Sequence, residues 1–167
     1  MKRPGRVWTV WAAAVAVLAA AAPVRAQKAV FLVRHAEKVD ESDDPLLSAA
    51  GKARARALAR HLRTAGVKAI YVTQYKRTGL TAAPLAAAAG LKPIVVHSDA
   101  RQELVDRIRK DNPNDVVLVV GHSDSVPEVL GLLGHPEPVT IAHAEYDNLV
   151  VAIPNKGGPP TVLRLRY

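Results

Sequence analysis

The sequence contains no cysteine among its 167 residues. It therefore has no disulfide, no thiol nucleophile and no cysteine-ligated zinc site. Aromatic residues make up only 4% of the chain, and both tryptophans, Trp8 and Trp11, lie close to its N-terminus. Basic residues are not interleaved with aromatic ones in any cluster, so the formal net charge of +8 does not predict a nucleic-acid partner.

The N-terminal segment has the pattern of a secretory signal peptide. Lys2, Arg3 and Arg6 precede an uncharged apolar run over residues 7–22, and small residues follow at Val24 and Ala26. An uncleaved anchor is the alternative, but the run is shorter than the roughly 20 residues that a membrane span needs. We therefore expect a signal peptide over residues 1–26, cleavage after Ala26, and a periplasmic or secreted protein with no stable membrane anchor.

Residues 27–167 have the pattern of one α/β domain. The expected strands cover residues 29–33, 69–73, 93–96, 116–120, 148–153 and 161–165. The expected helices cover residues 48–65, 78–89, 101–111 and 125–133. Short apolar strands joined by helices indicate a parallel sheet covered on both faces, and the last two strands form a hairpin around residues 157–160. The predicted fold is a three-layer α/β/α sandwich with a mostly parallel sheet and a late antiparallel hairpin.

Two of the expected strands deliver a histidine at their carboxyl ends. His35 follows Arg34 after the first strand, and His122 follows Gly121 after the strand over residues 116–120, which is the most hydrophobic one. Open parallel sheets bind ligands beyond the carboxyl ends of their strands. If the two strands are neighbours, both imidazoles reach one pocket, and Arg77 at the start of the second helix adds a cation to it.

An ordinary loop position is the simpler explanation for either histidine taken alone. A metal site is the rival use of the pair. Arg34 and Arg77 argue against it, because cations beside a site disfavour a bound metal ion. Arginine together with histidine instead matches recognition of phosphate. We therefore expect no metal and no other cofactor.

Four segments resemble, in the expected order, the motifs of the histidine phosphatase (phosphoglycerate mutase-like) superfamily. Residues 32–38 (LVRHAEK) resemble its RHG-type signature, with Ala36 where many members have glycine. Residues 47–51 (LSAAG) resemble the stretch that opens the first helix, and residues 75–82 (YKRTGLTA) resemble the R-x-x-x-T-A segment. Residues 121–127 (GHSDSVP) resemble the second-histidine motif.

The resemblance implies a metal-independent phosphatase in which His35 is the nucleophile and becomes phosphohistidine. It implies that Arg34, Arg77 and His122 bind the phosphoryl oxygens. Phosphoryl transfer needs positive charge around three equatorial oxygens, which arginines supply at any relevant pH. The expected substrate is a phosphorylated small molecule or a phosphorylated macromolecule.

The general acid that protonates the leaving group is not fixed by the motifs. Many members of the superfamily place a carboxylate in the segment after the third strand, where this chain has Asp99 and Glu103. We favour Glu103 and keep Asp99, Asp124 and Glu37 as alternatives. Each of them is otherwise explained as a solvated surface carboxylate.

Two other functions fit the same motifs. A phosphoglycerate mutase would use the same phosphohistidine, but the chain is short for such a mutase and has the pattern of an exported protein. A non-catalytic phosphate-binding module would need no intact set of arginines and histidines. A phosphatase is therefore the favoured interpretation.

Overall fold

The computed structural model describes residues 29–167. The predicted signal peptide and its cleavage after Ala26 lie outside the described residues. The strands are β1 (Ala29–Arg34), β2 (Val67–Val72), β3 (Ile94–Val95), β4 (Val116–Gly121), β5 (Asn148–Asn155) and β6 (Gly158–Arg166). The helices are α1 (Ala49–Leu62), α2 (Lys76–Ala89), α3 (Arg101–Asp111) and α4 (Ser125–Leu132).

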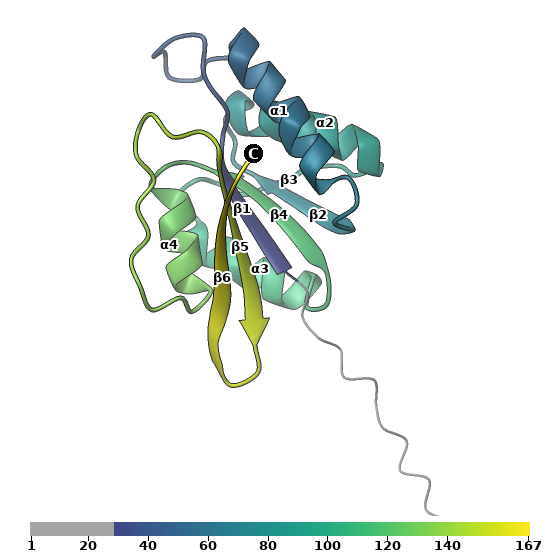
Figure 1. Ribbon diagram of the computed structural model, residues 1–167, viewed down its shortest axis with the longest axis vertical. Helices are drawn as coiled ribbons and strands as arrows, with labels where there is room; N and C mark the ends of the chain where they lie inside the picture. The colour runs from purple at the N-terminus through teal and green to yellow at the C-terminus, as the bar shows by residue number, and fades with distance from the viewer. Residues whose placement is uncertain (1–28) are drawn as a thin grey trace, which may run out of the picture.

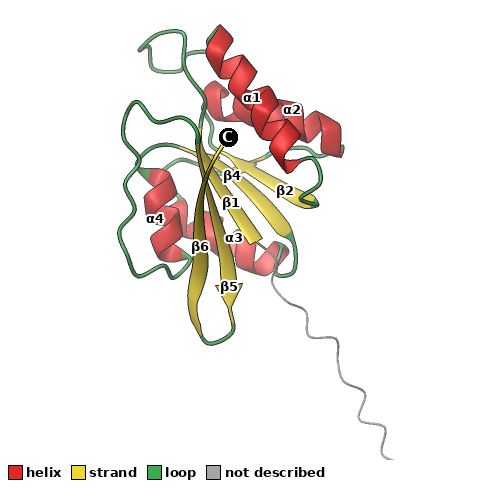
Figure 2. Cartoon of the chain, viewed as in Figure 1, coloured by secondary structure: helices red, strands yellow, loops and turns green. Residues whose placement is uncertain are grey.

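The strands form one sheet in the order β3-β2-β4-β1-β5-β6. The pairs β3–β2, β2–β4 and β4–β1 are parallel, whereas β5 is antiparallel to both β1 and β6. Helices α1 and α2 cover one face of the sheet, and α3 and α4 cover the other (Figures 1 and 2). This arrangement confirms the predicted three-layer α/β/α sandwich with a mostly parallel sheet and a late antiparallel hairpin.

Strand β4 lies between β2 and β1, and all of its residues are buried. Val117 and Val119 face the core under α3 and α4, and Leu118 and Val120 face the core under α1 and α2. A strand that is buried on both faces has no polar face to show in its sequence, which is why it reads as an unbroken apolar run.

The structure differs from the sequence prediction mainly at the ends of elements. The predicted turn over residues 157–160 shrinks to Lys156–Gly157, since β6 already begins at Gly158. Pro159 and Pro160 lie within β6, which is an edge strand and therefore tolerates residues without an N–H group. The first predicted helix ends at Leu62 rather than residue 65, where Ala65 N–H donates to Leu62 O in a tight turn.

Two helix termini have well-defined caps. Ser48 caps α1, its hydroxyl accepting a hydrogen bond from Gly51 N–H at 3.0 Å. Helix α2 ends at Gly90, which adopts the left-handed conformation with φ +66°. Within residues 29–167, every helix is too short or too polar to span a bilayer.

Candidate active site

The two histidines meet because β1 and β4 are neighbours in register. Arg34 at the end of β1 pairs with Gly121 at the end of β4, so that His35 and His122 follow at the same edge of the sheet. Their ring centroids are 5.3 Å apart. They lie in an open pocket of about 310 Å³. Its lining residues are Arg34, His35, Lys38, Tyr75, Arg77, Ser98, Arg101, His122, Ser123, Asp124 and His143.

The backbone around His35 fixes the orientation of its ring. His35 N–H donates to Gly121 O at 2.9 Å, which ties the residue to the neighbouring strand. Nδ1 of His35 lies 2.8 Å from Ala36 O. A carbonyl oxygen can only accept, so Nδ1 carries the proton and Nε2 keeps its lone pair. Nε2 is therefore the atom of this buried imidazole that can attack an electrophile.

Both imidazoles are held in the neutral form at neutral pH. Burial is the largest cause and lowers the pKa of His35 to about 3, although the hydrogen bond to Ala36 O opposes it. Repulsion from a protonated His122 and from Arg34 and Arg77 lowers the pKa of His35 further. Burial and then the charge of Arg77 lower the pKa of His122 to about 4. Desolvation is thus the larger cause, and the arginines add to it.

Two arginines line the pocket beside the histidines. Arg34 donates from NH1 to His143 O at 2.6 Å, and its guanidinium lies 4.1 Å from the ring centre of Tyr146. Arg77 lies 4.1 Å from the ring centre of Tyr75. In each arginine Nε is buried without a hydrogen-bond partner among residues 29–167. A guanidinium has five N–H donors, so each arginine can offer its remaining N–H groups to the oxygens of an anion in the pocket.

His122 is positioned by the residues around the end of β4. Its N–H donates to Ser125 Oγ at 2.8 Å, and its Nε2 lies 3.1 Å from Thr73 Oγ1. A Cβ at Gly121 would come within 2.7 Å of Ser125 Oγ, so this position needs glycine for the serine to reach the backbone. The Gly121-His122 pair in the sequence is therefore one local structure, in which the glycine makes room for the group that holds the histidine.

Thr81 connects the nucleophile to the helix that carries Arg77. Its hydroxyl accepts a hydrogen bond from Ala36 N–H at 2.9 Å and donates to Arg77 O at 2.7 Å. Thr81 is fully buried. The R-x-x-x-T spacing thus places arginine and threonine one helical turn apart, with the threonine under the loop after His35.

The structure does not bring Glu103, the favoured general acid, to the pocket. Glu103 pairs with Arg107 at 3.1 Å on the exposed surface of α3. The residue of α3 that lines the pocket is Arg101. Residues two apart on a helix point in nearly opposite directions, so Glu103 faces away from the side that Arg101 presents.

Of the other candidate acids, only one lies at the pocket. Asp99 is exposed and pairs with His97, and Glu37 pairs with Arg54 at 2.7 Å. Neither lines the pocket. Asp124 is the one carboxylate among the described lining residues, and its Oδ2 lies 2.5 Å from NH2 of Arg101.

Several lining residues were not assigned to the site from the sequence. Tyr75, Ser98 and Arg101 follow the ends of strands or begin helices at the same edge of the sheet, and only that position gives a signal for them. Lys38 comes three residues after His35, and this nearness in the sequence is the signal for it. Histidine, aspartate and glutamate side chains do not gather in groups of three or more, as a metal ion would need, anywhere in residues 29–167.

Comparison with known proteins finds a family profile that matches part of the chain. Residues 30–101 match the profile of the Histidine phosphatase superfamily (branch 1). The matched segment holds Arg34, His35 and Arg77, and the fold adds His122 from outside it. No protein of curated function matches the sequence significantly.

Solved structures of several phosphatases share the fold. The protein histidine phosphatase SixA, solved with tungstate, is 17% identical with a TM-score of 0.66, over 83% of this chain and 96% of that one. A mycobacterial glucosyl-3-phosphoglycerate phosphatase is 15% identical with a TM-score of 0.61, over 84% and 98%. An Entamoeba histolytica phosphoserine phosphatase with 3-phosphoglyceric acid is 15% identical with a TM-score of 0.62, over 83% and 96%. At these identities the likeness establishes the architecture.

Proposed function

We propose that this chain, which belongs to the histidine phosphatase superfamily, hydrolyses phosphate monoesters through a phosphohistidine intermediate on His35. The observation that carries the proposal is the hydrogen bond between Nδ1 of His35 and Ala36 O, which leaves Nε2 free beside Arg34, Arg77 and His122. A neutral, oriented imidazole among fixed cations is what attack on a phosphoryl group requires.

The reaction has two steps. In the first, Nε2 of His35 forms a bond to phosphorus while the bond from phosphorus to the ester oxygen breaks, and the departing oxygen takes up a proton. In the second, water attacks phosphorus, the P–N bond breaks, and inorganic phosphate leaves with the proton of water passed to a base. Arg34 and Arg77 stabilise the charge on the equatorial oxygens in both steps.

We expect the protonation state of His122 to differ between the free site and the site with bound phosphate. In the free protein its pKa of about 4 keeps the ring neutral beside the arginines. A bound phosphate dianion reverses the local charge and favours the protonated ring, which then donates to a phosphoryl oxygen. We assign the proton transfer to the leaving group to Asp124, the carboxylate that lines the pocket.

A phosphoramidate, such as phosphohistidine in a protein, is a second candidate substrate. The observation that favours it is the ion pair of Asp124 with Arg101, which engages the carboxylate of the pocket with another side chain. A leaving imidazole has a pKa near 6.5 and can take its proton from solvent, so it needs no acid from the enzyme. SixA, whose architecture this chain shares, is described as a protein histidine phosphatase.

Replacing the nucleophile tests the mechanism. We expect His35→Ala to lower turnover of a chromogenic phosphate monoester by several orders of magnitude, with an unchanged circular dichroism spectrum. Brief mixing of the wild-type protein with labelled substrate should yield an acid-labile phosphoprotein that His35→Ala does not form. A variant with near-normal turnover would exclude the phosphohistidine route. Binding of phosphate without turnover by the wild type would support a phosphate-binding module, and phosphoryl transfer between two hydroxyls of one acceptor would support a mutase.

We propose that the activity needs no metal ion, since arginines supply the positive charge of the site. Turnover should persist in EDTA, and tungstate or vanadate should inhibit by occupying the place of the phosphoryl group. Loss of activity in EDTA that zinc or magnesium restores would overturn this proposal.

We also propose that the protein is exported and begins at Gln27 after cleavage. The test is the mass of the protein in a periplasmic extract, together with its fluorescence. Trp8 and Trp11 are the only tryptophans in the chain, so the mature form should emit as tyrosine alone. Tryptophan emission from the exported protein would show that the N-terminal segment is retained.

A further inference from the structure

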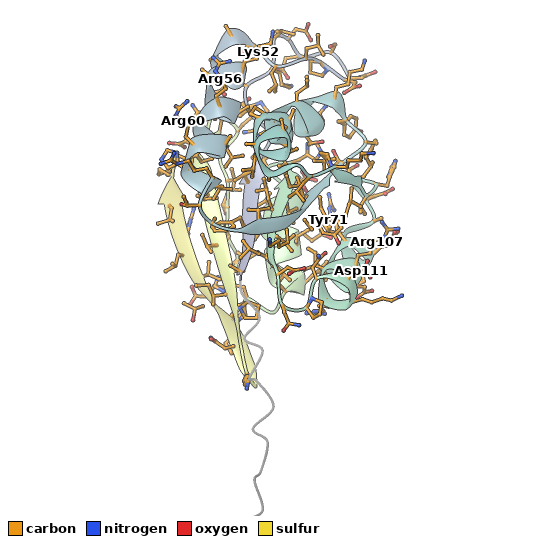
Figure 3. The ribbon with its side chains drawn as sticks, turned by 90° about the vertical axis from the view of Figure 1, so that its right-hand side faces the viewer. Lys52, Arg56, Arg60, Tyr71, Arg107 and Asp111 are labelled. Atoms are coloured by element: carbon orange, nitrogen blue, oxygen red, sulfur yellow. The ribbon has the colours of Figure 1, made fainter. Side chains whose placement is uncertain are left out.

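The outer face of α1 carries a row of cations. Lys52, Arg56 and Arg60 lie four residues apart, so they line one side of the helix, as Figure 3 shows. All three are exposed, and α1 contains no acidic residue. No carboxylate in the described part of the chain forms an ion pair with any of them.

Some other surface arginines of the protein have acidic partners, whereas none lies within residues 29–167 for Arg63, Arg109 and Arg164. Arg54, on the same helix, pairs with Glu37, and Arg166 pairs with Glu145 and Asp147. Like charges four residues apart on a helix repel each other and destabilise it. The repulsion among Lys52, Arg56 and Arg60 therefore destabilises α1, and no carboxylate in the described residues compensates for it. A bound ligand of opposite charge would.

An apolar groove of about 330 Å³ runs beside the same cations. Its lining residues are Leu47, Lys52, Ala55, Arg56, Leu80, Ala83 and Pro84. Leu80 of α2 is 38% exposed there, which is high for a leucine that neighbours a core. The surface therefore combines a recess that accepts an apolar side chain with two cations on its rim.

We infer that this surface is a docking site for an acidic protein segment that inserts an apolar side chain between α1 and α2. Charge complementarity requires carboxylates opposite Lys52, Arg56 and Arg60, and the groove requires an aliphatic side chain among them. A membrane is a poorer fit, since membrane-binding surfaces insert protruding apolar side chains, whereas the apolar residues here line a hollow. A nucleic acid is also a poorer fit, because the lining holds no aromatic residue on which a base could stack.

The docking site lies next to the candidate active site. Leu47 of the groove forms a β-bridge with Lys38, and Lys38 lines the catalytic pocket. A protein held on α1 would therefore have its neighbouring residues beside His35. The inference does not depend on the proposed function, because binding to α1 can be measured whether or not the protein hydrolyses phosphate.

Binding of a fluorescent synthetic peptide by the folded protein tests the inference. The probe is a short helical peptide with glutamates four residues apart and leucines between them, measured by fluorescence polarisation at low and moderate salt. We expect saturable binding that weakens as salt rises. Arg56→Glu combined with Arg60→Glu should lower the affinity by at least tenfold. Lys92→Glu combined with Lys110→Glu is the matched control, with the same change in charge at exposed positions elsewhere, and should bind as the wild type does.

The groove is tested separately from the charge. Leu80→Ala, and a probe in which serine replaces leucine, should each bind several-fold more weakly. Equal loss of affinity in the Lys92/Lys110 control, or equal binding of the serine probe, would overturn the inference, because the attraction would then be non-specific charge. Tighter binding of anionic vesicles or single-stranded DNA, abolished by the Arg56/Arg60 variant, would also overturn it. Turnover of a small chromogenic ester by the Arg56/Arg60 variant should equal that of the wild type.

Discussion

Asp124 separates the two substrate classes proposed for the site. If it donates the leaving-group proton, Asp124→Asn should lower kcat on an alkyl phosphate by about 10²-fold. A nitrophenyl phosphate leaves without help and should lose much less. The measurement is kcat on both esters for each variant. Glu103→Gln is the control, because Glu103 pairs with Arg107 away from the pocket, and it should match the wild type on both esters.

Unchanged turnover of the alkyl phosphate by Asp124→Asn would remove Asp124 from the mechanism. In that event a high rate on a phosphohistidine peptide, with a low rate on alkyl phosphates, would support the phosphoramidate as the substrate.

The buried state of His35 makes a prediction about pH. Its pKa of about 3 in the free protein keeps the nucleophile unprotonated in mild acid, so kcat/KM should not fall through pH 6.5 as it would for an exposed imidazole. We expect an optimum below pH 7 and substantial activity at pH 5. Arg77→Gln removes a positive charge, which raises the pKa of both histidines and should move the acid limb to higher pH. An acid limb at pH 6.5 in the wild type, unmoved in Arg77→Gln, would contradict this account.

At the residue scale, the sequence predicted which residues reach the pocket edge of the sheet better than it predicted which side chains point into the pocket. One pocket is lined by Arg34, His35, Arg77 and His122, because each lies at a strand end, directly after one, or in the first turn of a helix at one edge of the sheet. The acid was not predictable, since Glu103 lies on α3 with its side chain directed away from the pocket, whereas Asp124 precedes α4 at the edge of the sheet. Ala36 fits where glycine is common because its backbone is not left-handed and its methyl group packs with Leu47 and Ala55.

At the scale of elements, α1 depends on a close approach at Gly51. A Cβ there would overlap the backbone carbonyl of Glu37, two residues after the nucleophile. Gly51→Ala should therefore destabilise the protein by about 2 kcal/mol in urea unfolding and also lower kcat, since the loop after His35 must shift. Gly79→Ala in α2 is the matched control, with nothing within 4 Å of the new Cβ. We expect it to be neutral or stabilising by up to about 1 kcal/mol. Equal unfolding midpoints for the two variants would show that the contact with Glu37 does not hold α1 in place.

The elements that the sequence predicted best are those with a strong local signal. Helix α3 begins and ends at its predicted residues, because apolar positions recur on one face between polar ones. Strand β3 shrank from four expected residues to Ile94 and Val95. It is an edge strand whose extent depends on β2 alone, and nothing local in the sequence encodes that partner.

At the scale of the whole molecule, the two histidines couple stability to pH. Each has an unfolded pKa near 6.5 and a folded pKa of about 3 or about 4, so the unfolded chain binds more protons as the solution becomes acidic. Their contribution to stability is therefore full above pH 6.5 and is lost as the pH falls towards 4. We expect the free energy of unfolding to drop by about 3–4 kcal/mol between pH 7 and pH 5 from these groups.

The double variant His35→Gln/His122→Gln tests whether these two histidines cause the pH dependence of stability. It should lose much of this pH dependence in urea unfolding, whereas the exposed His61→Gln should retain it. A double variant with the wild-type slope would mean that other groups cause the acid sensitivity.

The place of β4 in the sheet has a consequence for folding during synthesis. β1 and β2 share no ladder, and β4 joins them although it comes after both in the chain. A nascent chain that has not yet released residue 121 from the ribosome thus lacks the strand that unites its halves, and neither the central sheet nor the paired histidines can form. Folding of this topology waits for most of the polypeptide. That delay leaves the chain without its central sheet until late in synthesis, as passage through a translocation channel would require if the export proposed above takes place.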